Sequence, residues 1–329
     1  MSNLREQVDR VTSVVVGRRR EIEVVLAALA SGRNVVLEGP PGTGKSTLLR
    51  AVADARDTEL VFVEGNAELT PARLVGSHDP ALVLERGYTP ETFVDGPLVR
   101  AMREGGLLYL EELNRIPEET LNVLVTAMAE REIHVPRLGR VAAEPGFVVV
   151  AAMNPFDAVG TARVSAAVYD RTNRVAMPYQ VEADETDIVA RALVAHHLDA
   201  RPLIAPAVAL VRSTRNHDDI RVGASVRGAI DLVLLAGELA ELRSRPATDR
   251  GVTLDAALAA LTGRIRLHEG TERSPEQVVE TLWSRFFATL ETAPPDDDPA
   301  DEAESDDGDR ASRGKALSAP DATPAAPGS

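Results

Sequence analysis

An eight-residue loop constrains this chain more than any other feature of its sequence. Residues 39–46 read Gly-Pro-Pro-Gly-Thr-Gly-Lys-Ser, the phosphate-loop pattern of a glycine, four residues and then Gly-Lys-Ser. An apolar strand is predicted directly before the loop, at residues 34–38, and a helix directly after it, at residues 47–53. In that setting backbone N–H groups turn toward phosphate oxygens, and the helix N-terminus adds partial positive charge. The loop therefore predicts a phosphate-binding site between a strand and a helix.

Two side chains of this loop carry specific expectations. We expect Lys45 to reach the β- and γ-phosphates of ATP, and the Ser46 hydroxyl to hold Mg²⁺. The chain has 34 arginines but only two lysines, Lys45 and Lys315, and a compact ammonium fits between phosphates where a planar guanidinium would not. A glycine-rich turn with a chance lysine is the alternative, and the agreement of strand, loop and helix argues against it. The residues expected to contact the nucleotide are Gly39, Pro40, Pro41, Gly42, Thr43, Gly44, Lys45, Ser46 and Thr47.

Composition narrows the remaining classes of protein. The length of 329 residues suggests two domains, and the absence of cysteine excludes disulfides and cysteine-based metal sites. No apolar run approaches the length of about 18 residues that spans a membrane, and the N-terminus lacks the apolar segment of a signal peptide, so we expect a cytoplasmic protein. The net charge is −15, of which residues 291–329 carry −8. An acidic body argues against nucleic acid as a partner.

Strands alternate with helices in the first part of the chain. Helices are expected at residues 97–104 and 117–131, and turns suggest a short hairpin around Gly87 and another around Leu138-Gly139. The expected strands are residues 35–38, 60–64, 107–110, 147–152 and a fifth that begins at 175. This alternation predicts an α/β fold with a mostly parallel five-stranded sheet and helices on both faces.

The pattern changes after Tyr179. Every later periodic segment is predicted to be helical, and no strand competes: residues 184–198, 205–215, 225–243, 253–267 and 275–290. From about residue 292 the chain is rich in Pro, Asp, Ala, Ser and Gly and has too few apolar residues to fold. We therefore expect a nucleotide-binding domain at residues 1–181, an all-helical lid domain at 182–291 and a disordered acidic tail at 292–329.

Two acidic residues follow the strand at residues 107–110. In phosphate-loop ATPases such a strand presents one carboxylate to water bound to Mg²⁺, and the next carboxylate polarises the attacking water. Glu111 is thus the expected metal-site residue, in a place where Asp is usual, and its extra methylene extends the carboxylate by about 1.5 Å. Glu112 is the expected general base. The alternative is a strand end with two solvent-facing acids.

A polar residue also follows the strand at residues 147–152. The amide of Asn154 could orient the attacking water against the γ-phosphate. Alternatively, Asn154 could be only a cap or turn residue before Pro155.

These elements, taken in order, resemble the MoxR family of AAA+ ATPases. The resemblance covers roughly residues 14–270 and begins with Val16-Gly17-Arg18. The other matching segments are Gly39 to Ser46, Glu111 to Arg115, Ala152 to Pro155, Gly160-Thr161, Asp170-Arg171 and Gly223 to Arg227. Residues 93–98 and 131–146 resemble the family's insertion and its hairpin. The expected fold is therefore an AAA+ phosphate-loop NTPase followed by an all-helical lid.

The resemblance also assigns roles to arginines. Arg171 would be the arginine finger that reaches the ATP of a neighbouring subunit, and Arg174 is its rival. Arg227 would be the second sensor, which contacts the γ-phosphate from the lid. Ordinary surface salt bridges are the alternative for each. Two residues depart from the family pattern, Glu111 in place of Asp and Thr172 in place of Phe, and the first bears on the turnover rate.

The resemblance further implies an ATP-hydrolysing, Mg²⁺-dependent remodelling chaperone that forms rings, typically homo-hexamers. Such proteins act with von Willebrand factor A domain proteins on a client complex. Accessory ATPases of carbon monoxide dehydrogenase are among the similar proteins, through residues 114–121. The alternatives are the motor subunit of a magnesium-chelatase-like metal-insertion complex, a nucleic-acid motor, and a slow or non-hydrolysing nucleotide switch motivated by Glu111.

Overall fold

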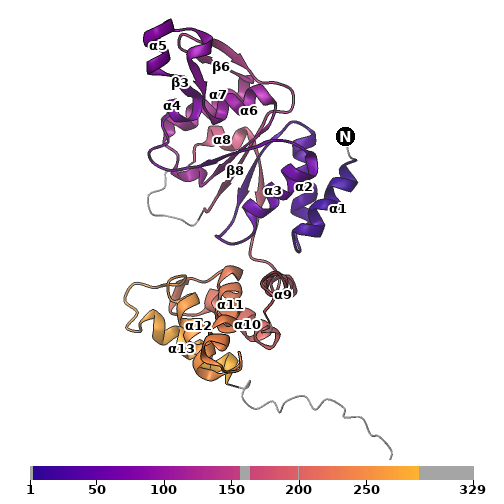
Figure 1. The fold of residues 1–329 in the computed structure, drawn as a ribbon, viewed down its shortest axis with the longest axis vertical. Coiled ribbons are helices and arrows are strands. Elements are labelled where there is room, and N and C mark those ends of the chain that lie inside the picture. Colours follow the sequence, from indigo (N-terminus) through magenta and orange to yellow (C-terminus); the bar gives the residue numbers. More distant parts are fainter. Residues whose placement is uncertain (1–2, 156–163, 199, 289–329) are drawn as a thin grey trace, which may run out of the picture. The chain divides into compact units, whose positions relative to one another are not determined.

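The computed structural model of the chain describes residues 3–155, 164–198 and 200–288 (Figure 1). These described residues all belong to one unit. The expected tail at residues 292–329 lies outside the described residues, as does the Gly160-Thr161 segment. The boundary that we expect at residue 181 remains a prediction.

A five-stranded parallel sheet forms the centre of the first part of the chain, as predicted. Its strand order is β2-β5-β8-β1-β9. The strands are β1 (Asn34–Glu38), β2 (Leu60–Glu64), β5 (Leu107–Glu111), β8 (Val148–Met153) and β9 (Thr172–Ala176). The register places Glu38 at the end of β1 beside Met153 of β8 and Ala176 of β9. The polar residues that follow β1, β5 and β8 therefore meet at one edge of the sheet.

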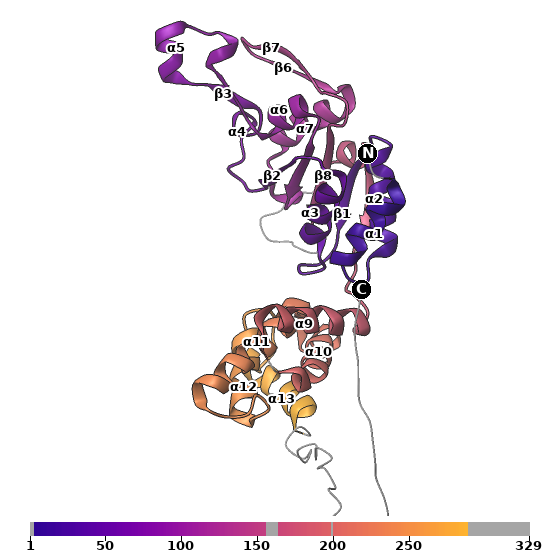
Figure 2. The ribbon, with the colours of Figure 1, turned by 45° about the vertical axis from the view of Figure 1, so that its right-hand side comes forward.

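Helices cover both faces of this sheet (Figures 1 and 2). Successive side chains of a strand point to opposite faces, so that Val35 and Leu37 pack into one apolar cluster and Val36 into another. The first cluster is covered by α1 (Leu4–Val14), α2 (Arg19–Ala30) and α3 (Lys45–Arg56). The second is covered by α4 (Pro71–Val75), α6 (Pro97–Glu104), α7 (Glu118–Glu130) and α8 (Ala166–Asp170). Burial on both faces explains why the three inner strands, β1, β5 and β8, are almost wholly apolar.

Two antiparallel strand pairs project from this core. The predicted hairpin around Leu138-Gly139 is confirmed as β6 (Glu132–Val135) and β7 (Gly139–Ala142). The predicted hairpin around Gly87 is wrong in detail, because β3 (Gly76–His78) pairs with β4 (Phe93–Asp95) around a helix, α5 (Pro80–Arg86). The Asp79 carboxylate caps that helix by accepting from the N–H of Ala81 at 2.8 Å. The Arg137 guanidinium lies 3.7 Å from the centre of the Tyr88 ring and so connects the two projections.

The later part of the chain is helical and has a hydrophobic core of its own. Its helices are α9 (Glu182–His196), α10 (Ile204–Ser213), α11 (Val226–Arg243), α12 (Arg250–Leu261) and α13 (Pro275–Phe287). It is not all-helical, because β10 (Ile220–Val222) pairs with β11 (Arg266–Leu267). The helix predicted at residues 253–267 ends early, at Leu261, close to Gly263, whose flexibility disfavours helix. Within the described ranges no helix is both long and apolar enough to cross a membrane.

Candidate nucleotide-binding site

The phosphate loop lies between the end of β1 and the first turn of α3. Gly42 and Gly44 have positive φ angles of 73° and 86°, which glycine adopts without steric cost. Gly39 is constrained differently, because a Cβ atom there would lie 2.1 Å from the carbonyl oxygen of Met177. A Cβ atom on Gly42 would lie 2.2 Å from the Ser225 hydroxyl in the helical region. The glycines thus permit both the turn and its close packing.

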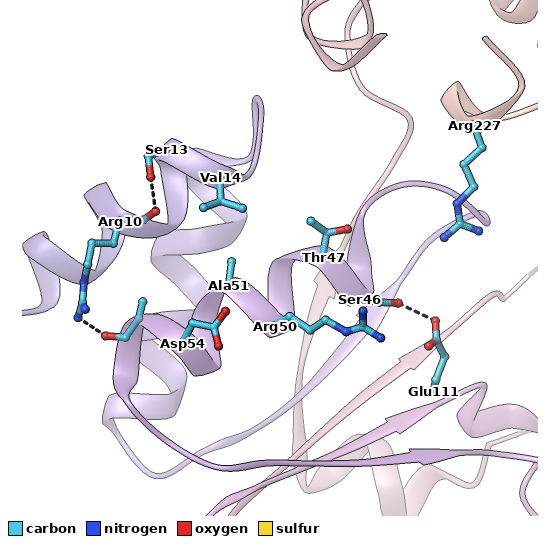
Figure 3. A pocket seen from close by; sticks show the side chains of 11 residues that line it. Arg10, Ser13, Val14, Ser46, Thr47, Arg50, Ala51, Asp54, Glu111 and Arg227 are labelled. Atoms are coloured by element: carbon cyan, nitrogen blue, oxygen red, sulfur yellow. Dashed lines mark hydrogen bonds between the residues drawn. The ribbon is translucent and has the colours of Figure 1, made fainter. Parts of the chain in front are cut away.

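A cavity of about 160 Å³ opens beside the loop and brings most of the predicted site residues together. It is lined by Pro41, Gly42, Gly44, Lys45, Ser46, Thr47, Glu111, Glu112, Ala152, Met153, Asn154 and Arg227. A second cavity of about 720 Å³ shares Ser46, Thr47, Glu111 and Arg227 with it (Figure 3). A third, of about 290 Å³, also contains Thr47 and Arg227 and is bordered by apolar residues that include Val15, Ile188 and Val226. Arg171 lines none of the three.

Lys45 is a partly desolvated cation in the first turn of α3. Its Nζ donates hydrogen bonds to the carbonyl oxygens of Gly39 at 2.8 Å and Pro40 at 2.9 Å. Burial lowers the pKa of Lys45 to about 8; the negative charge of Glu111 opposes this shift, and the positive charges of Arg227 and Arg18 add to it. An anion bound in the cavity would stabilise the charged form of Lys45, which burial disfavours.

Ser46 and Glu111 are directly joined. The Ser46 hydroxyl donates to Oε1 of Glu111 at 2.7 Å (Figure 3). Hydroxyl and carboxylate oxygens are ligands that Mg²⁺ accepts in proteins, so the residues present fit the metal expected here. The longer Glu111 side chain reaches Ser46 across the end of the sheet. Tyr109, two residues earlier on β5, also reaches Ser46: its hydroxyl donates to Oγ at 3.1 Å.

Glu112 follows β5 directly and has a positive φ of 54°. Its carboxylate lies in the cavity wall, with Oε2 at 3.2 Å from Nε of Arg115. Asn154 follows β8 and lines the same wall, and its carbonyl oxygen accepts from Nδ2 of Asn114 at 3.3 Å. A base candidate and a polar amide therefore share the cavity with the phosphate loop.

The two rival arginines occupy different surroundings. Arg171 lies at the start of β9, at the opposite edge of the sheet, where its Nη1 donates to the carbonyl oxygen of Ala167 at 3.0 Å. It lines a separate cavity of about 520 Å³ together with Arg33 and Arg131. Arg174 is instead paired with the Glu38 carboxylate, which also accepts from the Tyr169 hydroxyl at 2.6 Å. Both arginines therefore have partners within the subunit, since Nη1 of Arg171 also lies 3.6 Å from Oδ2 of Asp170. They differ in place: Arg171 lies away from its own phosphate loop, whereas Arg174 pairs with the last residue of β1, just before that loop.

Two arginines near the loop were missed by sequence reasoning. Arg18 is buried, and its Nη2 donates to the carbonyl oxygens of Thr43 in the loop at 3.2 Å and of Pro178 at 2.5 Å. The resemblance at Val16-Gly17-Arg18 indicated that Arg18 belongs to the family pattern, but it did not predict the contacts of Arg18 with Thr43 and Pro178.

Arg215 holds the segment that carries Arg227. Its Nε donates to the carbonyl oxygen of Ala224 at 2.9 Å, and its Nη2 to Glu185 at 2.7 Å. The guanidinium also lies 4.0 Å from the centre of the Tyr179 ring. Arg215 therefore links Tyr179, which follows β9, to Ala224, which lies just before the helix that carries Arg227.

This fold and this loop are those of phosphate-loop proteins of the AAA type. Residues 34–172 match the family model of the AAA domain, dynein-related subfamily. The uncharacterized protein YehL of Escherichia coli is 29% identical over 248 residues, which cover 72% of this chain and 67% of that protein. The uncharacterized protein YeaC of Bacillus subtilis is 28% identical over 267 residues, covering 74% and 80%.

Solved structures extend the similarity of fold into the helical region. A mutant of RuvB from Thermotoga maritima has a TM-score of 0.53 at 16% identity, covering 76% of this chain and 71% of that chain. A second RuvB structure, described as a Holliday junction branch migration motor, has a TM-score of 0.50 at 16% identity, covering 73% and 68%. The chain therefore has the phosphate-loop AAA fold with a helical C-terminal region.

Proposed function

We propose that this chain is a MoxR-type ATPase that hydrolyses ATP with Mg²⁺ at the phosphate loop. The observation that carries the proposal is the shared cavity, in which Lys45, Ser46, Glu111, Glu112, Asn154 and Arg227 meet from four separate segments. A cation, a hydroxyl–carboxylate pair, a second carboxylate and an amide are the groups that phosphoryl transfer to water requires. The match of residues 34–172 to the AAA domain family supports the same class of activity.

Each residue has a distinct task in this mechanism. Lys45 turns from the loop carbonyls to the β- and γ-phosphates, and Arg227 contacts the γ-phosphate from the helical region. Ser46 and Glu111 would hold Mg²⁺, which would neutralise phosphate charge. Asn154 orients the attacking water, and Glu112 accepts its proton. At the same time the water oxygen bonds to the γ-phosphorus and the bond between the γ-phosphorus and the ADP oxygen breaks.

Arg171 completes the site of a neighbouring subunit. Its place at the far edge of the sheet suits action in trans, because it cannot reach the phosphates beside its own Lys45 without rearrangement of β9. An arginine supplied in this way stabilises the charge that develops on the transferred phosphoryl group. We therefore propose a homo-oligomeric ring, a hexamer by resemblance to MoxR proteins.

The work of this ring would be the remodelling of a client complex in the cytoplasm, together with a von Willebrand factor A domain protein. Support comes from the MoxR-like segments and from the two projections, β3–β4 and β6–β7, which the resemblance also matched. A magnesium-chelatase-like motor is the second candidate, because it shares both projections. Purification of the Glu112→Gln chain in its ATP-bound form from native cells would separate the two by the proteins that it retains.

A phosphate-release assay tests the hydrolysis itself. Glu112→Gln should bind ATP with unchanged affinity but turn it over at least about 100-fold more slowly, the scale of a lost general base. Glu119→Gln, an exposed glutamate on α7, is the matched control and should leave turnover unchanged. Unaltered turnover in Glu112→Gln would overturn the base assignment. ATP binding without any release by the wild-type chain would favour the nucleotide switch.

A further inference from the structure

One hydroxyl within the candidate metal site has no part in the mechanism above. Tyr109 is fully buried in the middle of β5, and its ring packs edge-on against Phe62 with the ring centres 5.4 Å apart. Residues two apart on a strand share a face, so Tyr109 and Glu111 both point toward the first turn of α3. A wholly apolar side chain such as Phe would pack in this buried position equally well. The presence of a hydroxyl on Tyr109 therefore needs an explanation other than packing.

The hydrogen-bond geometry around Ser46 supplies one. A serine hydroxyl has one hydrogen and two lone pairs. The hydrogen goes to Glu111, since Oγ and Oε1 are 2.7 Å apart, and the Tyr109 hydroxyl donates to one lone pair at 3.1 Å. One lone pair remains. With two directed contacts the Ser46 side chain is fixed in a single orientation, and the remaining lone pair has a defined direction.

The direction of this contact avoids a conflict: because the Tyr109 hydroxyl donates to Ser46, it does not compete with Glu111 for the single Ser46 hydrogen.

We propose that Tyr109 is a positioning residue of the magnesium site: its hydroxyl orients Ser46 so that the remaining lone pair of Oγ faces the metal. The proposal rests on the proposed function, because it takes Ser46 as the metal ligand. Glu111 alone would leave Ser46 less constrained, since the longer glutamate side chain has one more rotatable bond than aspartate. Tyr109 supplies the second contact. Groups that orient a metal ligand in this way typically change metal affinity 10- to 100-fold when removed.

The test is Tyr109→Phe, which removes the hydroxyl and keeps the ring. Binding of a fluorescent ATP analogue is titrated against Mg²⁺ and repeated in EDTA, and Mn²⁺ binding to the nucleotide complex is followed by electron paramagnetic resonance. We expect the half-saturating Mg²⁺ concentration to rise about tenfold, and the affinity in EDTA to stay within twofold. Tyr169→Phe removes a hydroxyl bound to Glu38 instead and should leave the Mg²⁺ requirement unchanged.

Two further variants keep the proposal testable if the substitution also affects folding. Phe62→Leu loosens the ring packing without touching the hydroxyl, so it should lower the melting temperature without shifting the Mg²⁺ requirement. In a Ser46→Ala background, Tyr109→Phe should have no additional effect, because the group that it orients is gone.

The outcomes separate this proposal from the proposed function. An unchanged Mg²⁺ requirement in Tyr109→Phe, an equal shift in Phe62→Leu, or an equal loss of affinity in EDTA would overturn the positioning role. ATP binding by the wild-type chain that is indifferent to Mg²⁺ would instead overturn the metal site itself.

Discussion

The two edges of the central sheet hold their polar residues in contrasting ways. At the carboxyl edge, residues that follow β1, β5 and β8 converge on one cavity and are held there by hydrogen bonds within the subunit. At the amino edge, Arg171 precedes β9 and lines a separate cavity with two other arginines. A five-residue strand is about 16 Å long, so Arg171 cannot share the work of the carboxyl edge in its own subunit. Under the proposed function, the carboxyl edge would bind nucleotide and the amino edge would serve a neighbouring subunit.

The largest effect should come from removing the cation of the carboxyl edge. Lys45→Ala should abolish measurable nucleotide binding, because loss of an ammonium from a desolvated phosphate site costs several kcal/mol. Fluorescence anisotropy with a labelled ATP analogue measures the affinity, and circular dichroism verifies that the variant is folded. ATP binding close to the wild-type affinity would refute the assignment of the loop as the phosphate site.

The next effect concerns the amino edge. Arg171→Ala should bind ATP normally and yet lose about 10³-fold in turnover when it is assembled alone, the usual contribution of an arginine finger. The reason is that each intact pocket then faces a neighbour without a finger. Equilibrium binding and phosphate release, measured on the same preparation, separate the two properties.

Mixing the two variants distinguishes action in trans from a structural role. Arg171→Ala subunits keep an intact pocket, and Lys45→Ala subunits keep an intact finger. Mixed rings should therefore regain partial activity at junctions that join an intact pocket to an intact finger. If native mass spectrometry shows mixed rings but no activity returns, Arg171 acts within its own subunit or only in folding.

The pH dependence of ATP affinity tests whether the charge of Lys45 is needed for binding. The pKa of Lys45 is lowered to about 8 by burial, and a bound polyphosphate favours the charged ammonium, so the pKa rises on binding. Below pH 7 the lysine is already charged, whereas above pH 8 the free protein must take up a proton to bind. Affinity should thus fall about tenfold from pH 7 to pH 9. Calorimetry in buffers of different ionisation enthalpy should show the proton uptake, and affinity that does not change with pH would contradict it.

The sequence was sufficient to predict the sheet and the segments of the carboxyl edge, because strand, loop and helix signals are local. The signals for helix α5, namely the Asp79 cap and the residues that follow it, were also local. The prediction nevertheless placed a hairpin there, because Gly87 was interpreted as a turn between two strands. The pairs Arg174–Glu38 and Tyr109–Ser46 could not be predicted, since they join residues 136 and 63 positions apart. The strand pair β10–β11 was missed because two or three residues give no periodic pattern.

The smallest effect should come from Arg174, and it decides how the two edges divide their arginines. Its guanidinium pairs with Glu38, a carboxylate only 5% exposed that also accepts from Tyr169. Arg174→Ala removes one of these two donors, so we expect a loss of about 1–2 kcal/mol in the free energy of unfolding, measured by urea denaturation. Turnover should fall only a few-fold, because Glu38 stays anchored by Tyr169 and the neighbouring phosphate loop is displaced slightly. Arg174→Lys keeps the charge and should restore part of the stability. A loss of turnover near 10³-fold without a loss of stability would transfer the finger role from Arg171 to Arg174, and the carboxyl edge would then serve both its own subunit and its neighbour.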